Sequence, residues 1–328
     1  MFALTLAAPG DVRTVEVDRP QVVEPGDAIV RVTTASISTL DLERYAGRRT
    51  FPAVTPGGAC AGIVEETGEA VTRRHLDDPV LVPPALSVGG GIALPGYDLP
   101  GSHAGWIRVP DADLNLVPLP NPREFEAGGV LIADCYASAY EVARRLRGAG
   151  LRRPVVAGCG PTSLAFINAW NLQSGESVKP LAIDSIPGRV MLARRWGATG
   201  FVHRNDADLR ARMEGSLEPP PLAVVVGARS EGAEPGWVAM TGFEDLPVYT
   251  LDAPGFGWSA ESRDSFRPPQ PSPLCTAQGI GEHLATLLKG QLDLLPLVSH
   301  TLPLTEAPTA YEWAARGTHG ALRILLKA

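Results

Sequence analysis

The chain has 328 residues, with 29 Lys and Arg against 36 Asp and Glu, which gives a formal net charge of −7. A mildly acidic chain lacks the basic surface that nucleic acids require, and 45% hydrophobic with 20% charged residues excludes an intrinsically disordered protein. No apolar run approaches the ~20 residues of a membrane span, and the length predicts about two domains.

The N-terminal segment has no basic region and no signal-peptide pattern, so we expect a cytoplasmic protein. The four cysteines are far apart and include no C-x-x-C pair, which excludes a compact zinc knuckle. In the cytoplasm we expect four reduced and mostly buried thiols. They are Cys60, Cys135, Cys159 and Cys275.

Short β-branched runs between Gly and Pro turns predict strands in the first ~120 residues. The glycine-rich stretch 87–101 is expected to be a long loop. The predicted strands cover residues 28–33, 62–68, 79–84 and 106–110.

Beyond Asn121, helical spacing of apolar residues over 124–147 is followed by short apolar runs that alternate with helical segments. This alternation is typical of βαβ units in a doubly wound parallel sheet. The expected strands are 154–157, 180–184, 200–202, 221–226 and 237–240, and the expected helices are 163–172 and 189–196. The last ~35 residues return to short strands around a helix at 306–315, with Thr305 as its N-cap.

A glycine-rich turn follows the strand at 154–157, where dinucleotide-binding domains carry their G-x-G-x-x-G/A fingerprint. Gly158 permits the tight turn, Gly160 lets the backbone approach a pyrophosphate, and Ser163 is small enough to replace the third glycine. The helix N-terminus offers free N–H groups to the anion. The expected cofactor-binding residues of this turn are Gly158, Gly160, Pro161, Thr162 and Ser163.

Asp184 ends the next predicted strand, where a carboxylate accepts hydrogen bonds from the adenosine ribose and repels a 2′-phosphate. This position favours NAD over NADP as the cofactor. Arg189 lies one turn into the following helix, within reach of a phosphate, and keeps NADP open. The alternative is a domain of this fold whose turn binds no nucleotide.

Four stretches resemble the medium-chain dehydrogenase/reductase superfamily, the relatives of the zinc alcohol dehydrogenases. Residues 37–41 and 56–65 are similar to its I-C-G-T-D and P-G-H-E-x-A-G-x-V motifs, and residues 158–163 stand where it has G-x-G-P-x-G. Residues 298–304 with 310–312 resemble its C-terminal return. The resemblance implies an α/β protein with a GroES-like, β-barrel-type catalytic domain and a Rossmann domain with a doubly wound parallel sheet. The implied boundaries are 1–136 for the GroES-like catalytic domain, 137–278 for the Rossmann nucleotide-binding domain and 279–328 for the return to the catalytic domain.

The family's zinc ligands and proton relay are mostly replaced in this chain. Of the three catalytic ligand positions only Cys135 keeps a ligating side chain, and one thiolate does not hold Zn²⁺. The structural zinc lobe is also missing, because residues 87–101 contain no cysteine. We therefore predict a zinc-independent member with no bound metal. The replaced positions are Ser38 and Gly58 for two ligands, Ala59 for the neighbouring glutamate, Leu40 for the relay threonine and Glu43 for the relay histidine.

Without a metal, a hydrogen-bond donor or acid must polarise the acceptor, or conjugation must activate it, as in enoyl and quinone reduction. We expect Tyr45 or Tyr136 to donate a proton to a developing oxyanion, and Asp41 or Glu43 to act as a base if burial raises its pKa. The structural alternatives are a helix cap for Asp41 and core packing for Cys135 and Tyr45. The candidate catalytic set is Ser38, Thr39, Asp41, Glu43, Tyr45 and Tyr136, with Cys135 and Ser138 across the cleft.

Two segments after the fourth expected strand depart from the family. Residues 229–236 are too few for a normal crossover helix, and the Pro- and Gly-rich segment 252–273 is either a lid over the cofactor cleft or an irregular loop. Residues 273–278 are expected to form an apolar edge strand that pairs with its copy in a homodimer, as the resemblance implies.

The leading hypothesis is a zinc-independent, NAD(P)-dependent oxidoreductase of secondary metabolism. It acts on a small molecule, either as an alcohol or ketone dehydrogenase or as an enoyl- or quinone-type reductase, with no nucleic-acid or membrane partner. The alternatives are a non-redox enzyme on the same fold (a cyclase, eliminase or isomerase) and a redox-dead binding protein.

Overall fold

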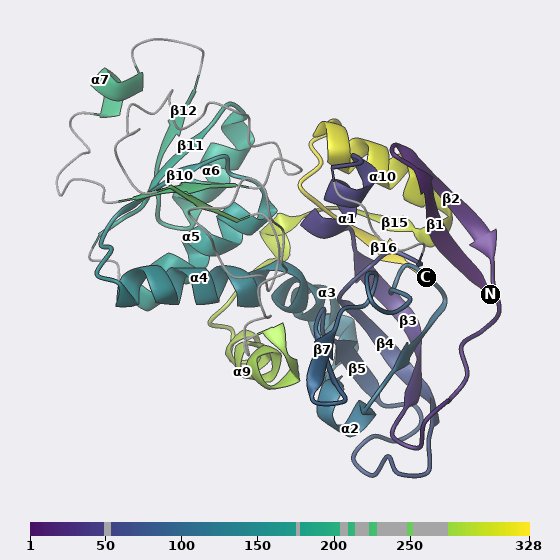
Figure 1. The fold of residues 1–328 in the computed structure, drawn as a ribbon. Coiled ribbons are helices and arrows are strands. Elements are labelled where there is room, and N and C mark those ends of the chain that lie inside the picture. Colours follow the sequence, from purple (N-terminus) through teal and green to yellow (C-terminus); the bar gives the residue numbers. More distant parts are fainter. Residues whose placement is uncertain (49–53, 175–177, 204–208, 214–222, 228–247, 252–274) are drawn as a thin grey trace. The chain divides into compact units, whose positions relative to one another are not determined.

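The computed structural model describes residues 1–48, 54–174, 178–203, 209–213, 223–227, 248–251 and 275–328. The chain divides into two compact units: unit 1 comprises Met1–Ala137 and Gln270–Ala328, and unit 2 comprises Ser138–Pro269 (Figure 1). Residue 279, the expected return point, lies inside unit 1, in helix α9 (Ala277–Leu288). No helix among the described residues is long and apolar enough to cross a membrane.

A seven-stranded sheet in the order β15-β16-β3-β4-β5-β9, with β8 paired to β3, forms the described core of unit 1. Val30, Val64, Val80 and Ile107 are buried in one cluster on it. The C-terminal strand β16 pairs antiparallel with β3 and places Leu325 opposite Ser36, beside the end of β3. The strands are β3 (Ala28–Ser36), β4 (Cys60–Thr67), β5 (Pro79–Val82), β8 (Trp106–Val109), β9 (Val117–Pro118), β15 (Val298–Pro303) and β16 (Arg323–Lys327).

Two antiparallel hairpins accompany this sheet: β1 (Phe2–Ala8) with β2 (Asp11–Glu16), and β6 (Leu86–Val88) with β7 (Gly91–Ala93). The β6–β7 hairpin corrects the expectation of an irregular loop over 87–101. Its turn uses Gly89 and Gly90 at φ +57° and +79°, values that match a tight two-residue hairpin turn. The α-helices of unit 1 are α1 (Thr39–Tyr45), α2 (Ala112–Asn115), α3 (Pro122–Leu131), α9 and α10 (Ala307–Arg316), and short 3-10 turns η5 and η6 cover Leu295–Leu297 and Leu304–Glu306.

A π-helical segment, η1 (Ile132–Tyr136), joins α3 to α4 (Ala137–Gly148) at the boundary between the two units. The Ala137 N–H donates to the carbonyl of Ile132, five residues earlier, which is the hydrogen bond that defines a π-helix. All five residues of η1 are buried. Such insertions occur often at functional sites.

Unit 2 contains a parallel sheet in the order β12-β11-β10-β13-β14, which confirms the α/β prediction. Its core includes Val155, Ala157, Ile183 and Val224. The expected helices begin two residues early, at the prolines Pro161 and Pro187, because proline suits a first helical turn. The elements are β10 (Pro154–Ala157), α5 (Pro161–Ser174), β11 (Leu181–Asp184), α6 (Pro187–Arg195), β12 (Thr199–Val202), α7 (Leu209–Met213), β13 (Ala223–Val226) and β14 (Val248–Thr250).

Several expectations at the C-terminal side of the chain need correction or lie outside the described residues. The edge strand over 273–278 is wrong at its end, since Ala277 and Gln278 begin helix α9, whose face of Ile280, Leu284 and Leu287 is buried. Thr305 lies in the 3-10 turn η6 and is not an N-cap, because α10 begins only after Glu306. Residues 229–236, 237–240 and 252–274 lie outside the described part of the chain.

Candidate functional site

The glycine-rich turn of unit 2 adopts the conformation that its sequence predicts. Gly158 has φ +84°, a value that L side chains rarely adopt, and its N–H donates to Ile183 O at 2.9 Å. A Cβ on Gly227, at the end of β13, would lie 2.6 Å from both Gly158 O and Ser163 Oγ. Glycine is therefore required at 158 because of its backbone conformation and at 227 because a side chain there would collide with the turn.

Asp184 ties the end of β11 to this turn. Its Oδ2 accepts the Cys159 N–H at 2.6 Å and its Oδ1 accepts the Ile186 N–H at 2.7 Å, and the residue is 1% exposed. Burial raises the pKa of Asp184, while these backbone N–H groups and the charge of Arg189 act in the opposite direction. The structure thus brings Asp184 and the buried Arg189 close enough to interact, at the end of the strand where the sequence places the ribose site.

Thr162 and Ser163 lie in the first turn of helix α5 and are both buried. Ser163, in place of the fingerprint's third glycine, is fully buried, and its Oγ makes no hydrogen bond to the described part of the chain. Its hydroxyl lies against Gly227, which has no side chain. Serine is small enough at this position for close packing, but its hydroxyl oxygen is buried.

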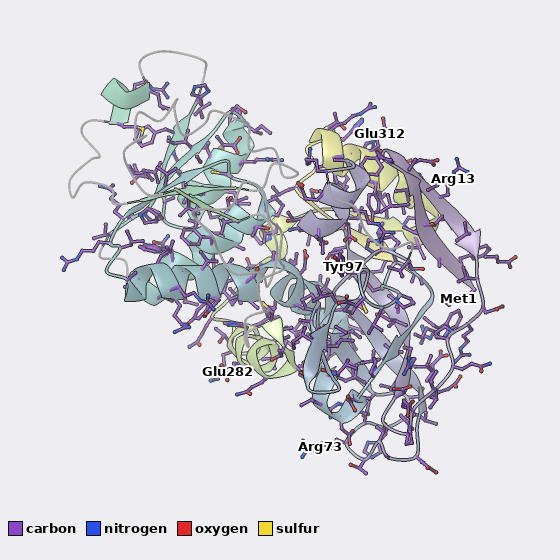
Figure 2. The ribbon with its side chains drawn as sticks, in the orientation of Figure 1. Met1, Arg13, Arg73, Tyr97, Glu282 and Glu312 are labelled. Carbon is purple, nitrogen blue, oxygen red and sulfur yellow. The ribbon has the colours of Figure 1, made fainter. Side chains whose placement is uncertain are left out.

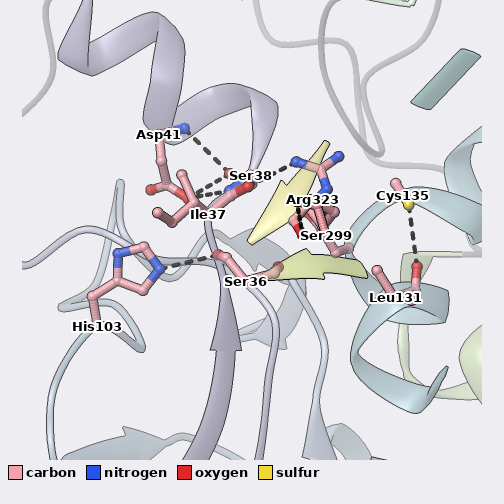
Figure 3. A network of polar contacts seen from close by, with 10 residues as sticks. Ser36, Ile37, Ser38, Asp41, His103, Leu131, Cys135, Ser299 and Arg323 are labelled. Carbon is pink, nitrogen blue, oxygen red and sulfur yellow. Dashed lines mark hydrogen bonds and ion pairs between the residues drawn. The ribbon is translucent and has the colours of Figure 1, made fainter. Parts of the chain in front are cut away.

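In unit 1, the turn between β3 and α1 is closed by a reciprocal capping box between Ser38 and Asp41. The Ser38 N–H and hydroxyl donate to Asp41 Oδ2 at 2.9 and 2.6 Å, and the Asp41 N–H donates to Ser38 Oγ at 3.2 Å (Figure 3). Asp41 Oδ1 accepts the Gly57 N–H at 2.9 Å and so fixes a second loop. The structure therefore shows the helix cap that was the alternative role of Asp41.

The other α1 candidates face different surroundings. Thr39 is fully buried, and Glu43 accepts two hydrogen bonds of 3.1 Å from Arg48 Nε. The Tyr45 ring packs on Tyr311 with centroids 5.5 Å apart. Burial raises the pKa of Tyr45, and Glu312 of α10 adds to this effect, whereas Arg316 opposes it. Tyr45 thus lies toward α10, whose residue Glu312 is labelled in Figure 2.

Cys135 and Tyr136 lie on the π-helical segment and are fully buried. The Cys135 thiol donates to Leu131 O at 3.5 Å (Figure 3). The Tyr136 ring meets the His283 ring edge-on at 5.3 Å, and burial lowers the pKa of His283 to about 4. Ser138, the last candidate, is buried at the start of unit 2.

The comparisons with known proteins agree with this architecture. Residues 24–121 match the model of the alcohol dehydrogenase GroES-like domain. A probable zinc-binding alcohol dehydrogenase, Rv1895, of Mycobacterium tuberculosis is 25% identical over 364 residues, covering 100% of this chain and 88% of the relative. The chain belongs to the medium-chain dehydrogenase/reductase superfamily.

Solved structures share the whole fold of this superfamily member. The alcohol dehydrogenase TADH from Thermus sp. ATN1 aligns with a TM-score of 0.77 and 26% identity, covering 100% of this chain and 99% of the other. An Escherichia coli CFT073 alcohol dehydrogenase complexed with NADH, rspB, aligns with a TM-score of 0.73 and 17% identity over 100% and 99% of the two chains. At that lower identity the likeness concerns the fold alone.

The donor set at the superfamily's zinc position does not fit a metal. Ser38 is bonded to Asp41, Gly58 has no side chain, and only Cys135 supplies a ligand atom. Across the described ranges, no three His, Cys, Asp or Glu side chains come together in a group that could hold a metal ion. A catalytic Zn²⁺ needs three protein ligands and an open position.

The sequence interpretation missed two buried polar groups of unit 1. His103 Nε2 lies 3.0 Å from Ser36 O and donates to it, because a carbonyl oxygen only accepts. In the neutral ring Nδ1 then carries no proton and accepts from the Tyr311 hydroxyl at 2.9 Å. Arg323 forms an ion pair with Asp134 and donates to Ile37 O. A lone Arg in the apolar run 321–326 was the visible indication of a buried charge that needs a partner.

Proposed function

We propose that this chain is an NAD(P)-dependent oxidoreductase that prefers NAD and transfers a hydride to or from a small molecule without zinc. One observation carries the proposal: the turn at Gly158 has the left-handed backbone of a dinucleotide fingerprint and is tied to Asp184 at the ribose position. The dehydrogenases that the chain resembles support the oxidoreductase class. A bound nicotinamide dinucleotide supplies the hydride acceptor or donor.

The residues of unit 2 fit such a cofactor. The first turn of α5, from Pro161, presents backbone N–H groups and the positive end of the helix dipole to a pyrophosphate. Asp184 holds the turn through the Cys159 N–H and is proposed to bond the ribose hydroxyls with its remaining lone pairs. A 2′-phosphate beside this carboxylate meets a like charge, and we expect NADH to bind roughly tenfold to a hundredfold more tightly than NADPH. Arg189 is the residue through which NADP would compete.

We propose that zinc is not used, because the side chains at its position are committed to bonds within the protein. Ser38 and Asp41 satisfy each other, which removes both from proton transfer. Of the two tyrosines, we propose Tyr136 as the acid, because it follows Cys135 on the π-helix, whereas Tyr45 packs against α10. Glu43 is the proposed base. Such a site suits acceptors activated by conjugation, such as enones and quinones, as well as ketones.

Titration with NADH and NADPH, followed by quenching of Trp170 and Trp196, tests the cofactor assignment. We expect saturable quenching by NADH in the micromolar range, with weaker binding of NADPH. Gly158→Val, which forces a β-branched residue to φ +84°, should abolish it, while Gly188→Ala should not, because a Cβ there meets open space. Failure of the wild-type chain to bind either nucleotide would refute the proposal.

A second candidate function is a non-redox enzyme or a redox-dead binding protein on the same fold. It is favoured by the closed hydrogen bonding of Ser38 and Asp41 and by the low exposure of the remaining candidates. Absorbance at 340 nm separates the candidates: an oxidoreductase consumes NADH with some member of a panel of enones, quinones and ketones, whereas the second candidate binds NADH and consumes none.

We also propose a homodimer that acts on a small molecule of secondary metabolism in the cytoplasm, with no nucleic-acid or membrane partner. The net charge of −7 supports the last point. The homodimer is supported only by the general tendency of exposed sheet edges to pair. The segment 273–278, which was expected to form the pairing strand, ends in the first residues of helix α9.

A further inference from the structure

Arg323 and Asp134 form an ion pair in the interior of unit 1. The distance from Arg323 Nε to Asp134 Oδ2 is 3.0 Å, and the two side chains are 1% and 2% exposed. Removing two charges from water is costly, and apolar side chains of similar size often stabilise a protein equally well. A buried pair of this kind therefore suggests a positional role that apolar packing does not fill.

Through Arg323, the ion pair connects the segment that contains Ile37 with the segment that contains Asp134, far away in the sequence. Arg323 Nη1 donates to Ile37 O at 2.7 Å, and Ile37 directly precedes Ser38. Asp134 directly precedes Cys135 on the π-helical segment. Ser38 and Cys135 stand at two of the positions that hold zinc in the superfamily, so one guanidinium ties together the backbones that carry both.

We propose that Arg323 is a positioning residue that replaces the metal as the cross-link of this site. It rests on the proposed zinc-free function. From β16, it fixes the turn after β3 to the segment Ile132–Tyr136 and so holds Cys135 and Tyr136 in place. The π-helix needs such an anchor, because an inserted residue lacks the regular α-helical hydrogen bonding and persists only where surrounding contacts define it.

The chemistry of the guanidinium suits this role. Its planar fork carries five N–H donors, so Nη1 donates to the Ile37 carbonyl while Nε lies 3.0 Å from the Asp134 carboxylate as an ion pair. An ammonium group at the end of a lysine chain is a single point of charge and does not reproduce this geometry. The hydroxyl of Ser299 further fixes the strand by donating to the carbonyl of Arg323 at 3.1 Å.

Alkylation of the cysteines with iodoacetamide under native conditions, read peptide by peptide by mass spectrometry, tests the proposal without cofactor or substrate. In wild type, Cys135 and Cys60 are fully buried and should react slowly. We expect Arg323→Met to raise the rate at Cys135 by at least about tenfold while Cys60 keeps its rate, because the π-helix opens locally. Arg323→Lys keeps the charge but lacks the planar guanidinium, so it should give an intermediate alkylation rate at Cys135. This variant replaces Arg323→Met in the test if Arg323→Met does not fold.

A matched control breaks another ion pair of the same unit. Arg108 Nε lies 2.6 Å from Asp27 Oδ2, and Asp27 is 1% exposed. Arg108→Met should lower the unfolding midpoint in urea and leave the rate at Cys135 unchanged. The double variant Asp134→Leu/Arg323→Met should recover the midpoint lost in Arg323→Met, since both charges are gone, while Cys135 stays fast.

Two results would overturn the proposal. Equal acceleration at Cys60 and Cys135 would mean that the pair only adds to global stability. A return of the alkylation rate at Cys135 to its wild-type value in the double variant would mean that apolar packing positions the segment Ile132–Tyr136 equally well. Neither readout involves a nucleotide, so a chain that failed to bind NADH would refute the proposed function and leave the labelling result intact.

Discussion

Replacing Ser163 with alanine should stabilise the protein. The Ser163 side chain is fully buried at the start of α5, and its Oγ makes no hydrogen bond to the described part of the chain. A buried hydroxyl without a partner costs roughly 1–3 kcal/mol, and alanine also has the better helix propensity. Loss of side-chain contacts offsets part of this gain, so we expect a net increase of about 1 kcal/mol in the free energy of unfolding, which corresponds to roughly 2–4 °C in Tm.

Calorimetry and urea unfolding of Ser163→Ala measure this effect, with Ser185→Ala as the control. Ser185 is exposed after β11, and its replacement should change stability by less than about 0.5 kcal/mol. The NADH dissociation constant of Ser163→Ala should stay close to that of wild type, because the hydroxyl faces Gly227. A drop in stability would refute the reasoning by showing that the hydroxyl is satisfied, and a large loss of NADH affinity would show that it binds the cofactor.

Three further outcomes follow from the same structure. Asp184→Ser should reduce the preference for NADH over NADPH by roughly tenfold or more, measured as a ratio of dissociation constants; an unchanged ratio would show that Asp184 does not touch the ribose. Burial lowers the pKa of His283 from 6.5 to about 4, so the unfolded state binds more protons within this window and stability falls as the pH drops through it. In urea unfolding, the free energy of unfolding should fall by about 2 kcal/mol between pH 7 and pH 5 in wild type and not in His283→Leu. The same dependence of this free energy on pH in both proteins would contradict the prediction. Gly57→Ala should destabilise unit 1 strongly, because its Cβ would lie 2.6 Å from the His103 backbone at φ +99°, and a near wild-type Tm would argue against this packing.

The sequence predicted those parts of the fold that rest on local pattern. The apolar runs 154–157 and 180–184 became β10 and β11 nearly as expected, because buried parallel strands are continuous and short. Gly158 was recognised because a strand, a glycine turn and a helix are consecutive in the chain. The helix cap, which was the alternative role of Asp41, is likewise local, since a capping box spans four residues; the part of Ser38 in it was not predicted.

The features that the sequence did not predict depend on contacts between distant segments. Arg323 reaches Ile37 and its partner Asp134 only because β16 pairs with β3, which brings the C-terminal strand beside Ile37. The hydrogen bond from Tyr311 to His103 joins residues 208 positions apart, and no spacing rule detects it. Residues 277 and 278 were misassigned because their short apolar context fits a strand, whereas the helical period appears only over the full length of α9.

A native mass spectrum of the purified chain, recorded with added NADH, tests zinc-free cofactor binding, because it counts cofactor and metal on the same molecule. We expect a species that carries one NADH per chain and no zinc, unchanged by prior dialysis against a chelator. A species that carries zinc, or a chain that never gains the mass of NADH, would contradict this expectation.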